Sequence, residues 1–284
     1  MATTTVAVGL PADWLNGWLA AIGVTALLPA VRLSWSDEPV PHAVFHHDDD
    51  VVLPRAIYDA LPSEETLQRL AIARHLPGVV EMKREVTLES YCQRASEERL
   101  APMPSLAMSV TDLVRLRKAG DGLPHSAFDV TVPRGITLAE RAMGCRAGIT
   151  NAAQVGAALS GASRRMDMNG LGFDVRRLKT APGGDVYADP VVELLAFHAL
   201  QLFPVRGDGR RHSTRGWSGP ASRRGSFTWA AWSMPLDSWA VDAWLQQLTA
   251  GVTDSPGLSI RYRSVPYQTS GSDVTRGYAA EVAW

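Results

Sequence analysis

One short segment of the 284-residue chain concentrates side chains that can bind phosphate. Residues 206–224 hold six arginines and one acid, so the segment has a net charge of +5. The arginines are Arg206, Arg210, Arg211, Arg215, Arg223 and Arg224. Guanidinium groups contact phosphate oxygens in pairs, and Trp217 in the same segment could stack on a base. The segment predicts a loop that binds a nucleic-acid backbone, with a solvated loop or a loop docked on an acidic protein as alternatives.

A second basic strip lies upstream, around two glycines. It consists of Arg164, Arg165, Arg176 and Arg177, which flank Gly170 and Gly172. Of the 28 basic residues in the chain 25 are arginine, which a GC-rich genome would also produce, but base composition does not explain the clustering. Residues 1–60 have the opposite balance, with seven acids and two arginines and therefore a charge of −5.

The run from His46 to Asp50, with the sequence HHDDD, is the candidate metal site. Imidazole and carboxylate groups suit a divalent metal, and His46, His47 and Asp48 would be the ligands of a metal-dependent nuclease or phosphohydrolase. Neighbouring residues on a strand or turn point in different directions, so one run rarely supplies a whole coordination sphere. We favour a solvated hairpin turn, with the metal enzyme as the alternative.

Other catalytic signatures are missing from the sequence. No glycine-rich phosphate loop or GxSxG elbow exists, and Cys145 has no identifiable histidine partner, so it is interpreted as a small buried thiol. His198 is interpreted as a core histidine. Cys92 and Cys145 form no CxxC pair, which argues against a disulfide framework or a zinc cluster and fits a reducing cytoplasm. We expect a protein that binds rather than catalyses, with no cofactor.

Apolar periodicity and cap residues predict the elements that position these groups. In the first half we expect a strand at 6–10, a helix at 14–28 capped by Asp13, and strands at 33–35, 42–45 and 51–53, the last two joined by the turn at 46–50. A helical middle would contain helices at 63–75, 86–99 and 137–160. In the second half we expect a helix at 191–203 opened by Asp189 and Pro190, a strand at 226–234, a helix at 236–248, and strands at 258–265 and 278–283. Residues 161–185 and 205–224 would be loops.

The order of these elements predicts an α+β fold, because strands and helices are mixed without a βαβα rhythm. A boundary within 161–189 divides the chain into an N-terminal α+β region, 1–160, and a C-terminal α+β region, 161–284. The apolar run 14–31 is interpreted as a buried helix, because it contains Asn16, Gly23 and Pro29 and no basic residue precedes Arg32. We therefore expect a cytoplasmic protein without a membrane span.

Three segments resemble a known group of proteins. The stretch LNGWLAAIGVTALL (15–28) resembles the first helix of subunits encoded in type I-U, also called I-G, CRISPR–Cas loci. The stretches DPVVELLAFHALQLFPV (189–205) and SFTWAAWSMPLDSWAVDAWL (226–245), with the basic loop between them, resemble the C-terminal part of the same group.

The resemblance implies a non-catalytic subunit of a Cascade-type surveillance complex in antiviral defence, either similar to the large subunit or accessory. Such a subunit would bind guide RNA or target DNA, or dock on the other subunits of the effector complex. A protein-interaction module that uses the acidic N-terminal region and tryptophan surfaces is a third hypothesis.

Overall fold

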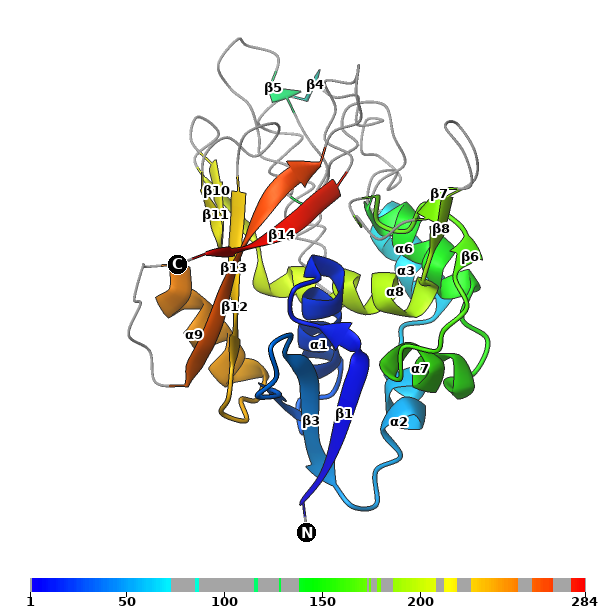
Figure 1. The fold of residues 1–284 in the computed structure, drawn as a ribbon. Coiled ribbons are helices and arrows are strands. Elements are labelled where there is room, and N and C mark those ends of the chain that lie inside the picture. The colour runs from blue at the N-terminus through cyan, green and yellow to red at the C-terminus, as the bar shows by residue number, and fades with distance from the viewer. Residues whose placement is uncertain are drawn as a thin grey trace.

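The computed structural model describes residues 2–72, 85–86, 115–116, 128, 138–172, 174, 178–179, 186–207, 212–218, 226–249, 257–267 and 277–283. Helices and small, mostly antiparallel sheets are mixed along the chain (Figure 1). The α+β class predicted from the sequence is confirmed.

The first sheet is antiparallel and has the strand order β1-β3-β2. Its strands are β1 (Ala2–Pro11), β2 (Arg32–Trp35) and β3 (His42–Asp48). Helix α1 (Leu15–Leu27) follows β1, and its N-cap is Trp14, which makes no capping hydrogen bond through its side chain. The prediction that Asp13 caps this helix is therefore wrong. The indole of Trp14 donates instead to Asp174, far along the chain.

The turn predicted at 46–50 is confirmed only at Asp49 and Asp50, and the return strand predicted after it is wrong. Strand β3 continues through His46 and His47 to Asp48, and helix α2 (Leu53–Ala60) stands where a return strand was expected. The long β1 offers β3 a partner along this whole length, with Ala2 opposite Asp48. Pro54 lies in the first turn of α2, a position that favours the start of a helix over a strand.

Four helices, α2, α3 (Glu64–Ile72), α6 (Leu138–Ala147) and α7 (Ala152–Leu159), form one side of the described molecule. The expected helix 137–160 is two helices, because Asn151 begins a new one. Its side chain accepts from the Gln154 N–H, and the Gln154 side chain accepts from the Asn151 N–H. This reciprocal capping box stabilises the start of a new helix at Asn151 relative to a continuation of α6. Of the helix expected at 86–99, Val86 lies in the two-residue strand β4 (Glu85–Val86), and the rest lies outside the described residues.

Helix α8 (Pro190–Ala199), continued by the short 3-10 helix η1 (Leu200–Leu202), is buried along its whole length. Its predicted start is confirmed, since the Asp189 carboxylate accepts from the N–H groups of Val191 and Val192. Helix α1 packs directly against it. A Cβ added to Gly23 of α1 would collide with the carbonyl oxygen of Leu195, so the two backbones meet where only glycine fits.

The larger C-terminal sheet has the order β11-β12-β13-β14, all antiparallel. Its strands are β11 (Trp217–Ser218), β12 (Ser226–Trp232), β13 (Leu258–Tyr267) and β14 (Gly277–Ala283), and helix α9 (Ser238–Thr249) lies between β12 and β13 in sequence. The three longer strands and the helix confirm the predicted elements.

The loops expected at 161–185 and 205–224 contain short strands, because short stretches of each loop pair with nearby strands. In the first loop they are β6 (Met166–Asp167) and β7 (Leu178–Lys179), which both pair with β8 (Val186–Ala188) just beyond it. In the second they are β9 (Val205–Gly207), β10 (His212–Thr214) and β11. A further short pair joins β4 (Glu85–Val86) to β5 (Arg115–Leu116).

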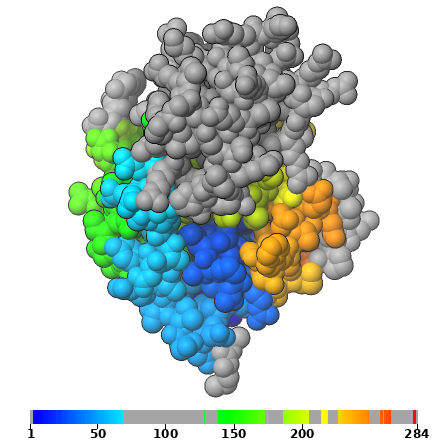
Figure 2. All heavy atoms as spheres, turned by 180° about the vertical axis from the view of Figure 1, so that it is seen from behind, coloured from blue at the N-terminus to red at the C-terminus, as the bar shows by residue number. Residues whose placement is uncertain are grey.

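Three indole N–H groups join the N-terminal part of the chain to β12. Trp18 donates to the Ala230 carbonyl at 2.9 Å, Trp229 donates to Ala12 at 2.8 Å, and Trp232 donates to Leu33 at 2.9 Å. From behind, the beginning of the chain lies between α2–α3 and α9 (Figure 2). One hydrophobic core therefore includes residues from both sides of position 161, and the proposed boundary there stays a prediction.

Within the described ranges, no helix combines the length and the hydropathy that crossing a bilayer requires.

The crossing of α1 and α8 gives a testable contrast between two helical glycines. Gly23→Ala should lower the free energy of unfolding by about 2 kcal/mol or more, because the methyl group forces the helices apart. Gly144→Ala in α6 is the control, because its added Cβ has no atom within 4 Å, and it should raise stability by about 0.5–1 kcal/mol. Urea denaturation of both variants measures the difference. Equal effects of the two substitutions would contradict the close crossing.

Candidate nucleic-acid interface

The two basic segments lie near opposite ends of α8, the first beside its start, where Ser163 donates to Asp189, and the second just after η1. The segment with Arg164 and Arg165 precedes the helix, in the neighbourhood of β6 and β8, and the segment that begins at Arg206 follows η1 (Figure 1). Ten residues of α-helix and three of 3-10 helix together span about 20 Å. Because α8 is buried and packed on α1, this spacing is fixed by the core.

The first basic segment is held to the core by a buried carboxylate. Glu193 of α8 is fully buried, and it accepts from the Leu171 backbone N–H at 2.5 Å and from the Asn16 side-chain amide at 2.7 Å. Gly170 has a φ of +52°, and a Cβ there would lie 2.5 Å from the Glu193 Oε2 atom. Trp14 Nε1 donates to Asp174 at 2.8 Å and holds the far side of the same turn.

Sequence reasoning missed Glu193, although there was a signal for it. It is the only acid within the apolar helix that runs from Pro190 to Ala199, and a buried carboxylate needs hydrogen-bond donors. The pattern identifies the residue but not its donors, which come from distant segments.

The structure describes two of the four arginines of the first strip. Arg164 is exposed and has no hydrogen-bond or ion-pair partner in the part of the chain that the structure describes, and Arg165 is half-buried. Arg176 and Arg177 lie outside the described residues. Arg164 is therefore a cation available to an external anion.

The second basic segment begins with a hairpin rather than a loop. Strands β9 and β10 pair antiparallel, with Ser213 opposite Arg206. The backbone thus places Arg206 on a strand that leads directly out of η1. Arg210, Arg211, Arg223 and Arg224 lie outside the described residues, so their contacts with phosphate stay a prediction.

Arg215 occupies a different position from the one its sequence context suggested. Its guanidinium forms an ion pair with Asp242 of α9 and donates to Gln246 at 3.2 Å, and its side chain is only 10% exposed. Asp242 lies 27 residues further along the chain, which is why the pairing is not visible in the local pattern. The structure makes Arg215 an anchor that holds the segment on α9.

Trp217 is likewise engaged with the core. Its ring lies 5.4 Å from the Phe128 ring and 5.7 Å from the Phe227 ring, measured between centroids, and it is partly buried. Packing a large indole on two phenylalanines removes apolar area from water, which an open loop cannot do. The expectation of a tryptophan on a free loop is therefore wrong.

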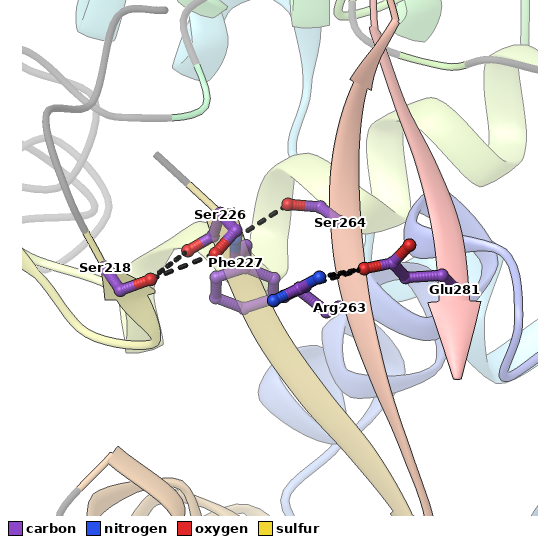
Figure 3. A network of polar contacts seen from close by, with 6 residues as sticks. All are labelled: Ser218, Ser226, Phe227, Arg263, Ser264 and Glu281. Carbon is purple, nitrogen blue, oxygen red and sulfur yellow. Dashed lines mark hydrogen bonds and ion pairs between the residues drawn. The ribbon is translucent and has the colours of Figure 1, made fainter. Parts of the chain in front are cut away.

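Polar contacts between strands stabilise the sheet that contains the end of the second basic segment (Figure 3). Ser218 on β11 contacts the Ser226 hydroxyl at 3.0 Å, and the Phe227 N–H donates to Ser264 Oγ at 2.7 Å. Arg263 on β13 forms an ion pair with Glu281 on β14. The contacts link all four strands from β11 to β14.

The candidate metal ligands do not converge. His46 and His47 lie on opposite faces of β3: His46 Nε2 contacts Ser34 Oγ at 2.8 Å, and His47 Nε2 contacts Thr5 Oγ1 at 2.9 Å. Burial lowers the pKa of His46, and the positive charges of Arg32 and His47 add to this effect. Over the described residues, no group of three histidine, cysteine, aspartate or glutamate side chains is placed to hold a metal ion.

Two buried groups match their predicted structural roles. Cys145 is fully buried, and burial, followed by the negative charge of Glu193, raises the pKa of its thiol, which keeps it protonated. His198 is fully buried on α8, and neither of its ring nitrogens has a hydrogen-bond partner in the described structure. Burial lowers the pKa of His198 to about 4, so the ring is neutral at pH 7.

Comparison of the chain with protein-family models, with curated proteins and with solved structures finds no significant match in any of the three.

The buried carboxylate can be tested by substitution. Glu193→Gln keeps one acceptor oxygen but loses the charge that both donors need, so we expect a loss of about 1.5–3 kcal/mol in unfolding free energy. The exposed pair Arg55–Asp59 supplies the control, because Asp59→Asn should cost less than about 1 kcal/mol. Limited proteolysis should also cut Glu193→Gln faster near residues 164–174, where the turn is released. An unchanged cleavage pattern would show that Glu193 does not hold the turn.

His198 predicts a particular acid sensitivity. Below pH 6.5 the unfolded chain binds a proton at this residue and the folded chain does not until about pH 4, so stability should fall by about 2–3 kcal/mol across that window. His198→Leu should remove this part of the pH dependence and cost little at pH 7, because neither nitrogen bonds to the protein. His198→Gln separates polarity from titration, since glutamine is polar but does not titrate. Unfolding free energies at pH 7 and pH 4.5 provide the measurement, and identical slopes for wild type and His198→Leu would contradict it.

Proposed function

We propose that this chain is a non-catalytic, nucleic-acid-binding subunit of a type I CRISPR surveillance complex of the Cascade kind, working in the cytoplasm. Its two basic segments would bind the phosphate backbone of guide RNA or target DNA. The observation that carries the proposal is that Arg164 lies exposed on a segment beside the start of one buried helix, while Arg206 lies on the strand that follows the other end of that helix.

The spacing suits a polyanion better than a small ligand. The helix between the two segments is about 20 Å long, which corresponds to roughly six nucleotide steps of 3.4 Å along one strand of a duplex. Both sites are held before binding, the first through Glu193 and the second through Arg215. Such preorganisation reduces the entropy lost when the backbone is bound.

The distribution of charge supports one orientation of the nucleic acid. The acids Asp48, Asp49 and Asp50 are exposed where β3 ends, beside the N-terminus and away from β10 and β11 (Figure 1). Phosphates are repelled from that end and attracted to the other. The acidic end is then left for the other subunits of the complex.

The absence of catalysis in the proposal rests on local chemistry. The thiol of Cys145 is buried and kept protonated, and His46 and His47 face opposite sides of a sheet. The assignment to a surveillance complex rests on the resemblance of residues 15–28, 189–205 and 226–245 to subunits of that group.

A salt series tests the phosphate contacts. For the triple variant Arg164→Ala, Arg210→Ala, Arg211→Ala, the slope of log affinity against log salt should decrease by about one counterion for each lost contact, with little change in base preference. Fluorescence anisotropy with single-stranded RNA, single-stranded DNA and an RNA–DNA hybrid provides the measurement. Arg55→Ala is the control, because this exposed arginine lies on α2 and pairs with Asp59. A triple variant with the affinity and slope of wild type would refute the proposal.

A further inference from the structure

Strand β1 forms one edge of the N-terminal sheet, whose order is β1-β3-β2. Among the residues that the structure describes, β3 is its one strand partner, and no strand pairs with its outer side. The opposite edge, at β2, is closed by two backbone hydrogen bonds between Leu33 and Leu236. The end of α7 and Gly161 lie against Gly9, so the open part of the edge is residues 2–8.

The open edge lacks the features that keep proteins from pairing through their edges. Residues 2–8 read ATTTVAV, with no charge and no proline. Val6 and Val8 are 52% and 51% exposed. Exposed edge strands are normally protected by lysine, proline or a covering loop, and a long uncharged edge of threonine and valine is a template for another strand.

Opposite charges lie at the two ends of this edge. At the first end, Asp48 is opposite Ala2, and Asp48 and Asp50 are exposed. At the second end, Gly9 contacts Gly161, and the exposed Arg164 follows three residues later. Seven residues of strand separate the ends by about 24 Å.

We propose that the edge of β1 pairs antiparallel with β1 of a second copy of this chain. A twofold axis near Thr5 sets Thr4 opposite Val6 of the other copy and joins the two sheets into one six-stranded sheet. It also brings the acidic end of each copy to the Arg164 end of the other. The acidic groups and the basic group that would pair both lie on this chain, which favours a second copy over an unrelated partner.

The acidic end argues against nucleic acid at this site, since the phosphate backbone would face Asp48 and Asp50. The pairing is tested without nucleic acid, so the outcome does not depend on the phosphate-binding role that Arg164 has in the proposed function.

Sedimentation equilibrium of the full chain over a wide concentration range tests the dimer. Wild type should change from monomer to twice that mass, and Val6→Lys should raise the dissociation constant about tenfold or more. Thr4→Lys is a second variant at the same edge, and circular dichroism and melting temperature confirm that each variant folds. Val282→Lys on β14 is the matched control, because Val282 is also an exposed valine on an edge strand, and it should leave the dimer unchanged.

A charge exchange tests the antiparallel arrangement. Arg164→Glu alone, and Asp48→Lys with Asp50→Lys, should each weaken the dimer, and the combination of all three should restore it. A chain that stays monomeric, a dimer that is insensitive to Val6→Lys, or a combination that restores nothing would each overturn the proposal. If Val6→Lys altered only the co-purification of a different protein, the edge would belong to that protein and the proposal would also be wrong.

Discussion

The rest of the structure depends on the close crossing of α1 and α8. Gly23 lies against the carbonyl of Leu195, so the two helices meet backbone to backbone. At this distance Asn16 of α1 reaches the buried carboxylate of Glu193, and Trp18 on the same helix reaches β12. The pair of helices is therefore the scaffold to which the two larger sheets and the Gly170 turn are attached. A wider crossing would remove the Asn16 amide from Glu193, and a buried carboxylate that loses a donor is destabilised.

Sequence patterns predicted the elements whose signals are local. The start of α8 depends on Asp189 and Pro190, which are adjacent in sequence, and β12 was predicted from a local alternation of large and small residues. The elements that were predicted wrongly depend on distant partners. His46 and His47 continue β3 because β1 pairs alongside them and because Ser34 and Thr5 accept or donate hydrogen bonds there. Residue types alone favoured a turn at this position.

Sequence patterns are limited in the same way for the single side chains of the candidate interface, because they do not show contacts with distant residues. The clustering of arginines was visible, but whether an arginine is available depends on what folds beside it. Arg215 pairs with Asp242, whereas Arg164 stays exposed, and both have a basic neighbourhood in sequence. Glu193 is conspicuous as an acid in an apolar helix, yet its donor Asn16 is 177 residues away. Composition thus indicates the chemistry of a segment, and tertiary contacts select the residues that perform it.

The three indole hydrogen bonds also govern the order in which the chain can fold. They join residues separated by 212, 217 and 199 positions, so the N-terminal helix and strands acquire their partners only after β12 has left the ribosome. At typical rates of synthesis the wait is roughly 10 to 40 seconds. During that time α1, which is largely apolar and mostly buried in the finished fold, is exposed to water. Exposed apolar surface of this kind favours aggregation of a chain that is still incomplete.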